Sequence, residues 1–387
     1  MHHLRRARAV TGCDYVLAVM SGNFTQRGEP AIVDKFARAR MALVCGADAV
    51  VELPMLTAIS SAEGFAAGAV AALAALGAGS VCFGAENADI SALSAAAEAL
   101  LRLDQAPEYK ARLRGYLKSG LAFPAARARA VRDQGPGPGA ELLGLPNNIL
   151  AIEYLKAILR GGAKIQPFAI PREGAGYHDT DPALQNPSAA AIRAAVFERG
   201  WKAARGLMPP EAFEILADQA RRGFCPVSLD DFSDIFHYNV RRGPGWLADI
   251  AGAGEGIENR LIRAESLAWP VSGVLDALKT KRYTRAALRR LALCVVLGVT
   301  KDEARAAASP AYLRVLGFRR AAAPLISRIA EHASVPVVTN IKNAPDAVTA
   351  RLMADSRRDD AYYLPQARRG AAYPIGHNLS APMVIIQ

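Results

Sequence analysis

The chain has 387 residues, carries a formal net charge of +11 and has a sequence pI near 9.6. No apolar stretch approaches the roughly 18 residues that a membrane-spanning helix needs, so the sequence indicates no such span. This length predicts two or three domains. The surplus of arginine and lysine favours a polyanionic partner, because neutralised phosphates release their counterions. Arginine usage in a GC-rich genome is the alternative explanation of the charge.

The N-terminal residues and the cysteines indicate the cellular compartment of the protein. The N-terminal sequence MHHLRRARAV lacks the apolar core of a signal peptide. Scattered cysteines, odd in number and without metal-ligand spacing, predict free thiols in a reducing compartment. We therefore expect a cytoplasmic protein. The cysteines are Cys13, Cys45, Cys82, Cys225 and Cys294.

The most informative stretch spans residues 15–54. An apolar run over 15–20 predicts a strand, residues 31–45 have helical spacing, and 49–53 predict a second strand. Such a βαβ unit places a ligand beyond the carboxyl ends of its strands. Polar side chains gather there. Each alone is compatible with a solvated loop, and together they favour a site: Ser21, Asn23, Gln26, Arg27, Glu29 and Lys35.

Two further strands are predicted at 80–83 and 165–170, with helices before and between them. The first leads into Gly84, where a ligand can approach the backbone closely, although a simple strand-to-helix turn is the alternative. Asn147 and Asn148 open a helix, and helix capping explains only one of them. The basic segment that ends in a Gly-Pro repeat near residue 135 is expected to be a loop over the site or a surface excursion.

Beyond the second of these strands the sequence offers two more candidates. Ser188 is placed to cap a helix that carries Arg193, and a helix N-terminus with a hydroxyl and an arginine suits phosphate, although the pattern is common. His178 could act on protons, or it could fix its loop by pairing with Asp179.

After residue 201 helical sequence dominates, with strand-like runs only at 335–339 and 383–386. The sequence therefore predicts an α/β fold, with a Rossmann-like parallel-sheet domain over 1–200 and a mainly α-helical, basic domain over 201–387. One basic stretch has a tyrosine within it and suits a phosphate backbone, with a solvated basic face as the alternative. Its candidate nucleic-acid-binding residues are Lys279, Lys281, Arg282 and Arg285.

Several segments, in order, resemble the tRNA(Met) cytidine acetate ligase family, a branch of the HIGH-type nucleotidyltransferase superfamily: VMSGNFTQRGEPAIVDK, GADAVVELP, FGAE, PNNILAIEYLKAI, AGYHD, EGIENR and KTKRYT. The resemblance covers nearly the whole chain. It implies a nucleotidyltransferase domain that uses ATP, with Mg²⁺ bridging the phosphates, and acetate to form acetyl-adenylate. The acetyl group then passes to N4 of the wobble cytidine of elongator tRNA(Met), giving N4-acetylcytidine.

The resemblance also implies roles for residues. It assigns Gly84, Asn147, Asn148 and Arg172 to the ATP-binding face. Ser188 and Arg193 fall at the serine- and arginine-bearing phosphate motif of the superfamily, whose second hydroxyl is replaced here by alanine. Lys35 and Arg27 are added from their position at the sheet edge and not from the resemblance. The candidate catalytic residues are thus Arg172, Lys35, Ser188 and Arg193.

The start of the chain departs from the family pattern. Family members have a strand and a histidine-x-glycine-histidine signature directly before the helix matched here by residues 1–10. His2 and His3 are not these histidines. A late start codon and a shortened chain both explain the departure, and the upstream reading frame distinguishes them. Because losing one preorganised donor costs roughly a hundred- to a thousand-fold in rate, we expect this form to adenylate acetate poorly.

Two alternatives to the ligase remain. One is a nucleotidyltransferase that joins AMP to a phosphate-bearing metabolite, against which the basic helical half argues. The other is a non-catalytic RNA-binding protein of the same fold. Affinity for tRNA that falls steeply with salt supports either RNA hypothesis and not the metabolite one. The oligomeric state is left open.

Overall fold

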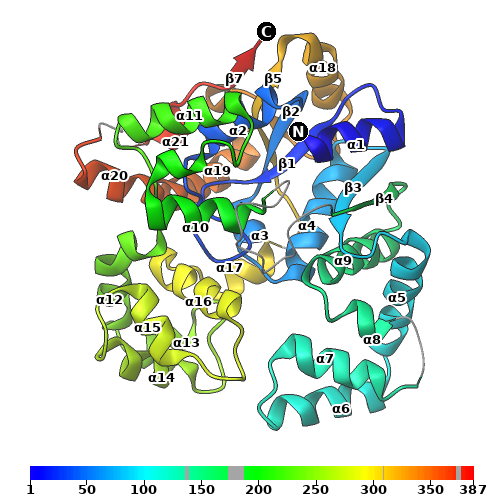
Figure 1. The fold of residues 1–387 in the computed structure, drawn as a ribbon, viewed down its shortest axis with the longest axis vertical. Coiled ribbons are helices and arrows are strands. Elements are labelled where there is room, and N and C mark those ends of the chain that lie inside the picture. The colour runs from blue at the N-terminus through cyan, green and yellow to red at the C-terminus, as the bar shows by residue number, and fades with distance from the viewer. Residues whose placement is uncertain (136–138, 173–186, 308, 372–375) are drawn as a thin grey trace.

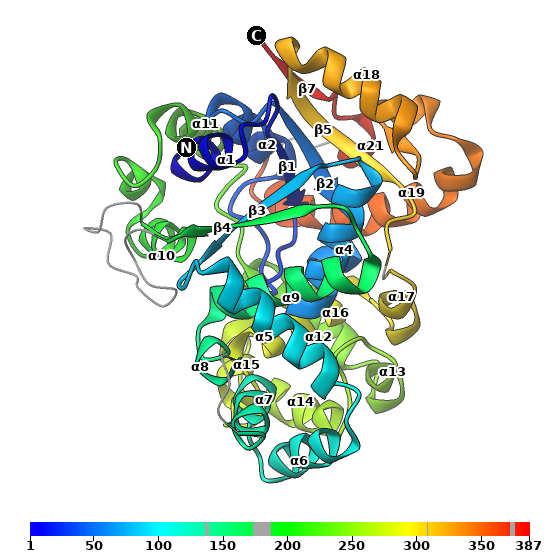
Figure 2. The same ribbon diagram turned by 90° about the vertical axis from the view of Figure 1, so that its right-hand side faces the viewer.

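The computed structural model describes residues 1–135, 139–172, 187–307, 309–371 and 376–387. Strands and the helices around them fill one end of the molecule, and two groups of helices extend from the opposite end (Figure 1). Turned by 90°, the molecule still shows both groups at that end (Figure 2). The predicted α/β fold with parallel strands is confirmed.

The larger sheet begins with the predicted βαβ unit. Strands β1 (Leu17–Ser21) and β2 (Ala49–Leu53) run parallel, and helix α2 (Lys35–Val44) connects them. The helix starts where the sequence provides a cap, because Asp34 Oδ1 accepts the Ala37 N–H at 2.8 Å. The polar loop before that cap therefore leaves the carboxyl end of β1.

Three strands from the last part of the chain complete this sheet. β5 (Leu313–Arg319) pairs antiparallel with β2, and β6 (Val337–Val338) and β7 (Val384–Ile386) run parallel to β5. The strand-like runs predicted at 335–339 and 383–386 contain β6 and β7, so the last part of the segment predicted as mainly helical contributes strands to the first sheet. Most of β5 is buried, including Arg314, so the strand lacks the alternation of apolar and polar residues by which a sequence reveals a strand.

A second, two-stranded sheet holds β3 (Ser80–Ala85) and β4 (Gln166–Pro171) in parallel register. Helix α1 (His2–Thr11) packs against both strands. Helices α4 (Ala62–Ala75) and α9 (Pro146–Gly161) pack on each other, and α9 also contacts β3. Among the described residues, β1 and β3 thus belong to different sheets.

The segment between β3 and α9 is helical throughout most of its described length. The expectation of a loop is wrong for residues 107–132, which are mostly helical, while the alternative of a surface excursion remains; part of the Gly-Pro repeat lies outside the described residues. Proline stands in the first turn of each of the two basic helices, where its missing N–H costs no hydrogen bond. Arginines on the outer faces obscured the helical spacing of buried alanines. The helices are α5 (Ile90–Leu103), α6 (Pro107–Lys118), α7 (Phe123–Arg132) and α8 (Gly139–Leu142).

The helices predicted between residues 201 and 307 are confirmed, and those between residues 229 and 297 enclose a large apolar cluster. Phe24, from the loop after β1, is fully buried in that cluster beside Tyr362, with ring centroids 6.0 Å apart. The loop is therefore anchored in the helical part. The helices here are α11 (Pro210–Arg221), α12 (Ser233–Val240), α13 (Pro244–Ala248), α14 (Ile257–Glu265), α15 (Val271–Leu278), α16 (Arg285–Leu297) and α17 (Lys301–Ala306).

The remaining helices cover the sheets and close the chain. No helix among the described residues is both long and apolar enough to cross a membrane. These helices are α3 (Met55–Ala58), α10 (Ala189–Arg199), α18 (Ala323–His332), α19 (Asp346–Asp359), α20 (Leu364–Arg368) and α21 (His377–Ser380).

Candidate nucleotide-binding site

The turn after β3 holds the two asparagines of the predicted site. The Glu86 carboxylate accepts the Asn147 Nδ2–H at 2.7 Å and the backbone N–H groups of Asn147 and Asn148 at 3.2 and 2.9 Å. An acidic side chain is stabilised there, because the first N–H groups of a helix point outward without partners inside the helix. Glu86 therefore fixes the first turn of α9 against the end of β3.

Asn148 is fully buried and only partly satisfied. Its Oδ1 accepts the Asn87 N–H at 3.0 Å, whereas its Nδ2 has no hydrogen-bond partner among the described residues. An unpaired buried donor costs about 1–3 kcal/mol, and such groups are a reason to look for a ligand or a functional role. The amide is therefore available to bind one.

Gly84 and Arg172 lie at the same edge. The Arg172 N–H donates to the Ala85 carbonyl at 3.0 Å, which continues the pairing of β3 with β4. A Cβ placed on Gly84 would lie 3.5 Å from Arg172 Cγ, an ordinary contact. The Arg172 residue is exposed. The structure thus brings together four predicted site residues: Gly84, Asn147, Asn148 and Arg172.

Ser188 and Arg193 form a different group. Ser188 Oγ accepts the Ala191 N–H at 3.0 Å and caps α10, as predicted. Arg193 donates from Nη1 to the Pro30 carbonyl at 2.9 Å and pairs through Nε with Glu29 Oε2 at 3.2 Å. Burial lowers the pKa of the Arg193 guanidinium. Ser188 and Arg193 thus belong to α10 and contact the loop before α2, whereas the first group lies at the ends of β3 and β4 and the start of α9.

The loop that contains Arg27 packs on helix α16. Glu29 also pairs with Arg289 at 2.7 Å, and Arg290 Nη1 donates to the Gln26 carbonyl at 3.2 Å. Gly28 has φ +75°, and a Cβ there would lie 2.3 Å from the Arg290 backbone nitrogen. This loop is therefore bound between α10 and α16.

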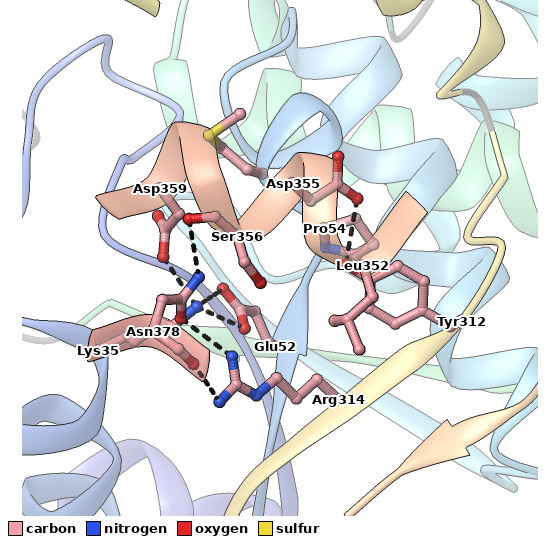
Figure 3. A pocket seen from close by; sticks show the side chains of 11 residues that line it. Lys35, Glu52, Pro54, Tyr312, Arg314, Leu352, Asp355, Ser356, Asp359 and Asn378 are labelled. Atoms are coloured by element: carbon pink, nitrogen blue, oxygen red, sulfur yellow. Dashed lines mark hydrogen bonds and ion pairs between the residues drawn. The ribbon is translucent and has the colours of Figure 1, made fainter. Parts of the chain in front are cut away.

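Lys35 requires a correction. Its ammonium is not presented to the sheet edge but buried, with Nζ 2.6 and 2.8 Å from the Glu52 carboxylate oxygens and 2.8 Å from Asp359 Oδ2 (Figure 3). Its backbone N–H donates to Asn23 Oδ1 at 2.8 Å. Lys35 is thus already neutralised by two carboxylates. The distant partner Asp359 could not be read from local sequence, whereas Glu52 inside the apolar strand AVVEL was a visible signal of a buried charge.

The same ion-pair cluster borders a small cavity of about 20 Å³, room for about one water molecule. Arg314 on β5 donates to the side chain and carbonyl of Asn378 at 2.9 and 2.7 Å (Figure 3). Asp359 Oδ1 has no hydrogen-bond partner among the described residues. Burial raises the pKa of the Asp359 carboxyl to about 6. The cluster joins the last part of the chain to α2 and β2, and its size excludes a nucleotide.

Three of the four predicted nucleic-acid-binding residues have partners within the protein. Lys279 Nζ donates to the carbonyls of Thr280 and Tyr283 at 3.0 and 2.9 Å. Arg282 pairs with Glu255, and Arg285 pairs with Asp276. The fourth residue, Lys281, is exposed.

Some predicted features are not tested by these contacts. Tyr177, His178 and Asp179 lie outside the described residues. In the part of the chain that the structure describes, no group of three or more histidine, cysteine, aspartate or glutamate side chains could hold a metal ion. These residues therefore provide no cage for Mg²⁺.

Residues 1–372 match the model of a family described as HIGH Nucleotidyl Transferase. This match agrees with an α/β fold in which a glycine, an arginine and a helix N-terminus meet beyond the carboxyl ends of parallel strands. The class of protein is therefore a HIGH nucleotidyltransferase.

Individual relatives narrow this class. The chain is 40% identical over 343 residues to tRNA(Met) cytidine acetate ligase of Caldanaerobacter subterraneus subsp. tengcongensis, covering 88% of this chain and 85% of the relative. It is 32% identical over 395 residues to that of Halothermothrix orenii, covering 96% and 93%. The crystal structure of Thermotoga maritima TmcAL bound with alpha-thio ATP matches with a TM-score of 0.88 at 32% identity, covering 100% of this chain and 95% of that one.

The chain belongs to the tRNA(Met) cytidine acetate ligase family. The resemblance seen in the sequence and the prediction of an enzyme of this family are confirmed.

Proposed function

We propose that this protein forms acetyl-adenylate from ATP and acetate and transfers the acetyl group to N4 of the wobble cytidine of elongator tRNA(Met). One observation carries the proposal. The residues that the family resemblance assigned to ATP, namely Gly84, Asn147, Asn148 and Arg172, meet at one strand edge, with a buried amide N–H unused. A solved relative of 32% identity holds an ATP analogue. Five free cysteines support a reducing, cytoplasmic setting.

In the first step an acetate oxygen attacks the α-phosphorus of ATP. The bond between that phosphorus and the bridging oxygen breaks, and pyrophosphate leaves. Negative charge grows on the phosphate oxygens, and a cation fixed beforehand stabilises it. Arg172 supplies this cation in our proposal, the glycine at position 84 admits the nucleotide, and Asn148 Nδ2 donates to the adenosine. Mg²⁺ would enter with the triphosphate, which supplies most of its ligands.

In the second step the cytosine N4 amine attacks the acetyl carbonyl carbon. The bond from that carbon to the AMP oxygen breaks, AMP leaves, and the amine loses a proton to solvent. The base must leave its stack to reach the acyl group, which is easiest in a single-stranded loop such as an anticodon. We propose that Arg193 acts by positioning the loop of residues 26–30 through Glu29 and Pro30, and Ser188 by capping α10.

Substitution of Arg172 tests the nucleotide site. We expect Arg172→Ala to weaken ATP binding about tenfold, because a charge-assisted contact to phosphate is lost. Equilibrium dialysis with labelled ATP measures the dissociation constant. Arg328→Ala removes an exposed arginine from α18 and is the matched control. Equal ATP affinity of Arg172→Ala and wild type would contradict the assignment of this site.

Mass analysis of tRNA(Met) from a deletion strain tests the reaction. N4-acetylcytidine should disappear from the wobble position and return when the gene is restored. Its persistence would overturn the proposed function. ATP binding without tRNA binding would then favour the metabolite nucleotidyltransferase, and tRNA binding without ATP binding would favour a non-catalytic RNA-binding protein.

A further inference from the structure

The hairpin of helices α6 and α7 carries an excess of positive charge on its surface. Six of its basic side chains are exposed, against two exposed acidic ones, Glu108 and Asp133. The basic residues are Lys110, Arg112, Arg114, Lys118, Arg129 and Arg132. We propose that this hairpin is an RNA-binding surface that contacts the phosphate backbone of the tRNA. The proposal rests on the proposed function, because that function supplies the RNA.

These six cations have no acidic partner within the described part of the chain. The hairpin's seventh basic residue, Arg127, is buried and pairs with Glu153 at 2.5 Å. Arg282 and Arg285, in the segment that the sequence favoured for RNA, each pair with a carboxylate. A paired cation must give up its partner before it neutralises a phosphate, whereas an unpaired one does not. The hairpin is therefore better prepared for a polyanion than the predicted segment.

A hollow on the hairpin has the composition of a nucleotide contact. It is shallow and open to solvent, and it is lined by Arg112, Gly115, Tyr116, Ser119 and Arg129. The Arg129 guanidinium lies 4.9 Å from the Tyr116 ring centroid. Arg112 Nη1 donates to the Asp133 carbonyl at 2.6 Å, and the Tyr116 hydroxyl donates to the Asp133 carboxylate. Both arginines are thus held over the hollow, beside an aromatic face of the kind that stacks on bases.

The hairpin is firmly connected to the candidate ATP site. Its second helix leads through α8 into α9, whose first turn contains Asn147 and Asn148. The buried Arg127–Glu153 ion pair fixes α7 to α9. The α6–α8 group and the α12–α16 group extend from the same end of the molecule in both views (Figures 1 and 2). An RNA bound to the hairpin would therefore lie on the side where the second helical group can also contact it.

The surface suits RNA better than a membrane. The hairpin exposes one large apolar side chain, Phe123. An interfacial membrane helix needs an apolar face along its length as well as a basic one. Stacking of arginine on tyrosine next to further cations matches a nucleotide's combination of phosphate and planar base.

Gly115 permits a sharp test. A Cβ on this exposed helical glycine meets no atom within 4 Å, and either a glutamine or a glutamate raises helix propensity. Gly115→Glu and Gly115→Gln should therefore both fold, which thermal melting checks. The two side chains differ mainly in charge. At low salt we expect Gly115→Glu to bind tRNA(Met) about fivefold more weakly than Gly115→Gln, with the difference shrinking as salt screens the charge.

A second variant measures the contacts themselves. In Arg112→Gln/Arg129→Gln the slope of log affinity against log salt should fall by about 1.5, since each lost phosphate contact removes about 0.7–0.9. Arg320→Gln/Arg328→Gln is the matched control and should keep the wild-type slope, because both exposed arginines lie in or just before α18, which is at the opposite end of the molecule (Figure 1).

The outcomes separate this inference from the proposed function. If the wild type binds tRNA but both hairpin variants keep its affinity and slope, the hairpin proposal is overturned and the function stands. If the wild type does not bind tRNA, both the proposed function and the hairpin proposal are overturned. Loss of binding to phosphatidylserine vesicles, with tRNA binding unchanged, would also overturn the hairpin proposal.

Discussion

Asp359 is a carboxylate held deep in the protein by charged neighbours. It contacts Lys35 and the Asn23 amide, and it lies close enough to Glu52 and Arg314 for their charges to act on it. Burial outweighs the attraction of the cations and raises the pKa of this carboxyl from 3.8 to about 6. Asp359 therefore connects the last part of the chain to the first sheet, although burial of its negative charge is unfavourable.

This pKa predicts a pH dependence of stability. Between pH 4 and 6 the folded chain holds a proton on Asp359 that the unfolded chain has lost, so the carboxyl's contribution to the free energy of unfolding falls as pH rises through this window. An asparagine does not titrate. We expect the difference in melting temperature, Asp359→Asn minus wild type, to be larger at pH 7 than at pH 4. Thermal melts at both pH values measure it, and a relative melting temperature that is constant or falls would contradict the raised pKa.

For single residues, the sequence could predict a position when the residues in contact with it are close in the chain, and it could not when they are distant. Gly84, Asn147, Asn148 and Arg172 stand directly at strand ends or a helix start, where local order and the family motifs place them. Lys35 was misplaced because its burial depends on Asp359, which local patterns cannot connect to it. The unused Asn148 Nδ2 depends on three-dimensional contacts and left no trace in the sequence.

Among the elements, the loop between β1 and α2 shows how closely two backbones can approach. Gly28 has a left-handed φ and faces the α16 backbone, with 2.3 Å between a hypothetical Cβ and the Arg290 nitrogen. Gly77 has a similar φ of +71°, but its hypothetical Cβ meets nothing within 4 Å. Comparing Gly28 with Gly77 therefore separates the cost of a strained φ from the cost of a clash between two elements.

Alanine at these two positions tests the docking of the loop. We expect Gly77→Ala to lower the free energy of unfolding by about 1 kcal/mol, because its φ is strained. Gly28→Ala should lower it by about 2–4 kcal/mol, because α16 must also shift. Urea unfolding measures both values. Equal losses in the two variants would show that the loop does not press against α16.

Elements were predictable where a helix cap or a clear period marked them. The predicted cap Ser188 accepts a backbone N–H of α10, and Asp34 and Thr284 cap α2 and α16 in the same way. Helices α6 and α7 were missed because arginines and a following Gly-Pro repeat resembled loop composition. Strand β5 was missed because its sequence LRVLGFR has two arginines and a glycine and no regular alternation, so its pairing with β2 is what identifies it as a strand.

For the whole molecule, the late strand β5 returns to the first sheet, and this return determines which parts of the chain can fold alone. Leu313 and Val315 of β5 pack with Val51 and Leu53 of β2 in one buried cluster, which also receives residues of α4. The helical part from 201 to 307 is therefore an insertion between strands of one sheet rather than a terminal domain.

A shortened chain tests this architecture. Residues 1–307 would expose one edge of β2 and the apolar side chains that β5 covers, so we expect this fragment to aggregate and to lack the near-UV circular dichroism of the full chain. The full chain, purified in parallel, is the control. A soluble, monomeric fragment with the native spectrum would show that β5 is dispensable for the first sheet.

The pairing of β2 with β5 also has a consequence for synthesis on the ribosome. About 260 residues separate the end of one strand from the start of the other, and at 5–20 residues per second the second strand emerges on the order of ten seconds or more after the first. During that interval β2 has one hydrogen-bonding side open to neighbouring nascent chains. The protein therefore depends on whatever shields this open side, a chaperone or its own helical insertion, until translation delivers the missing neighbour.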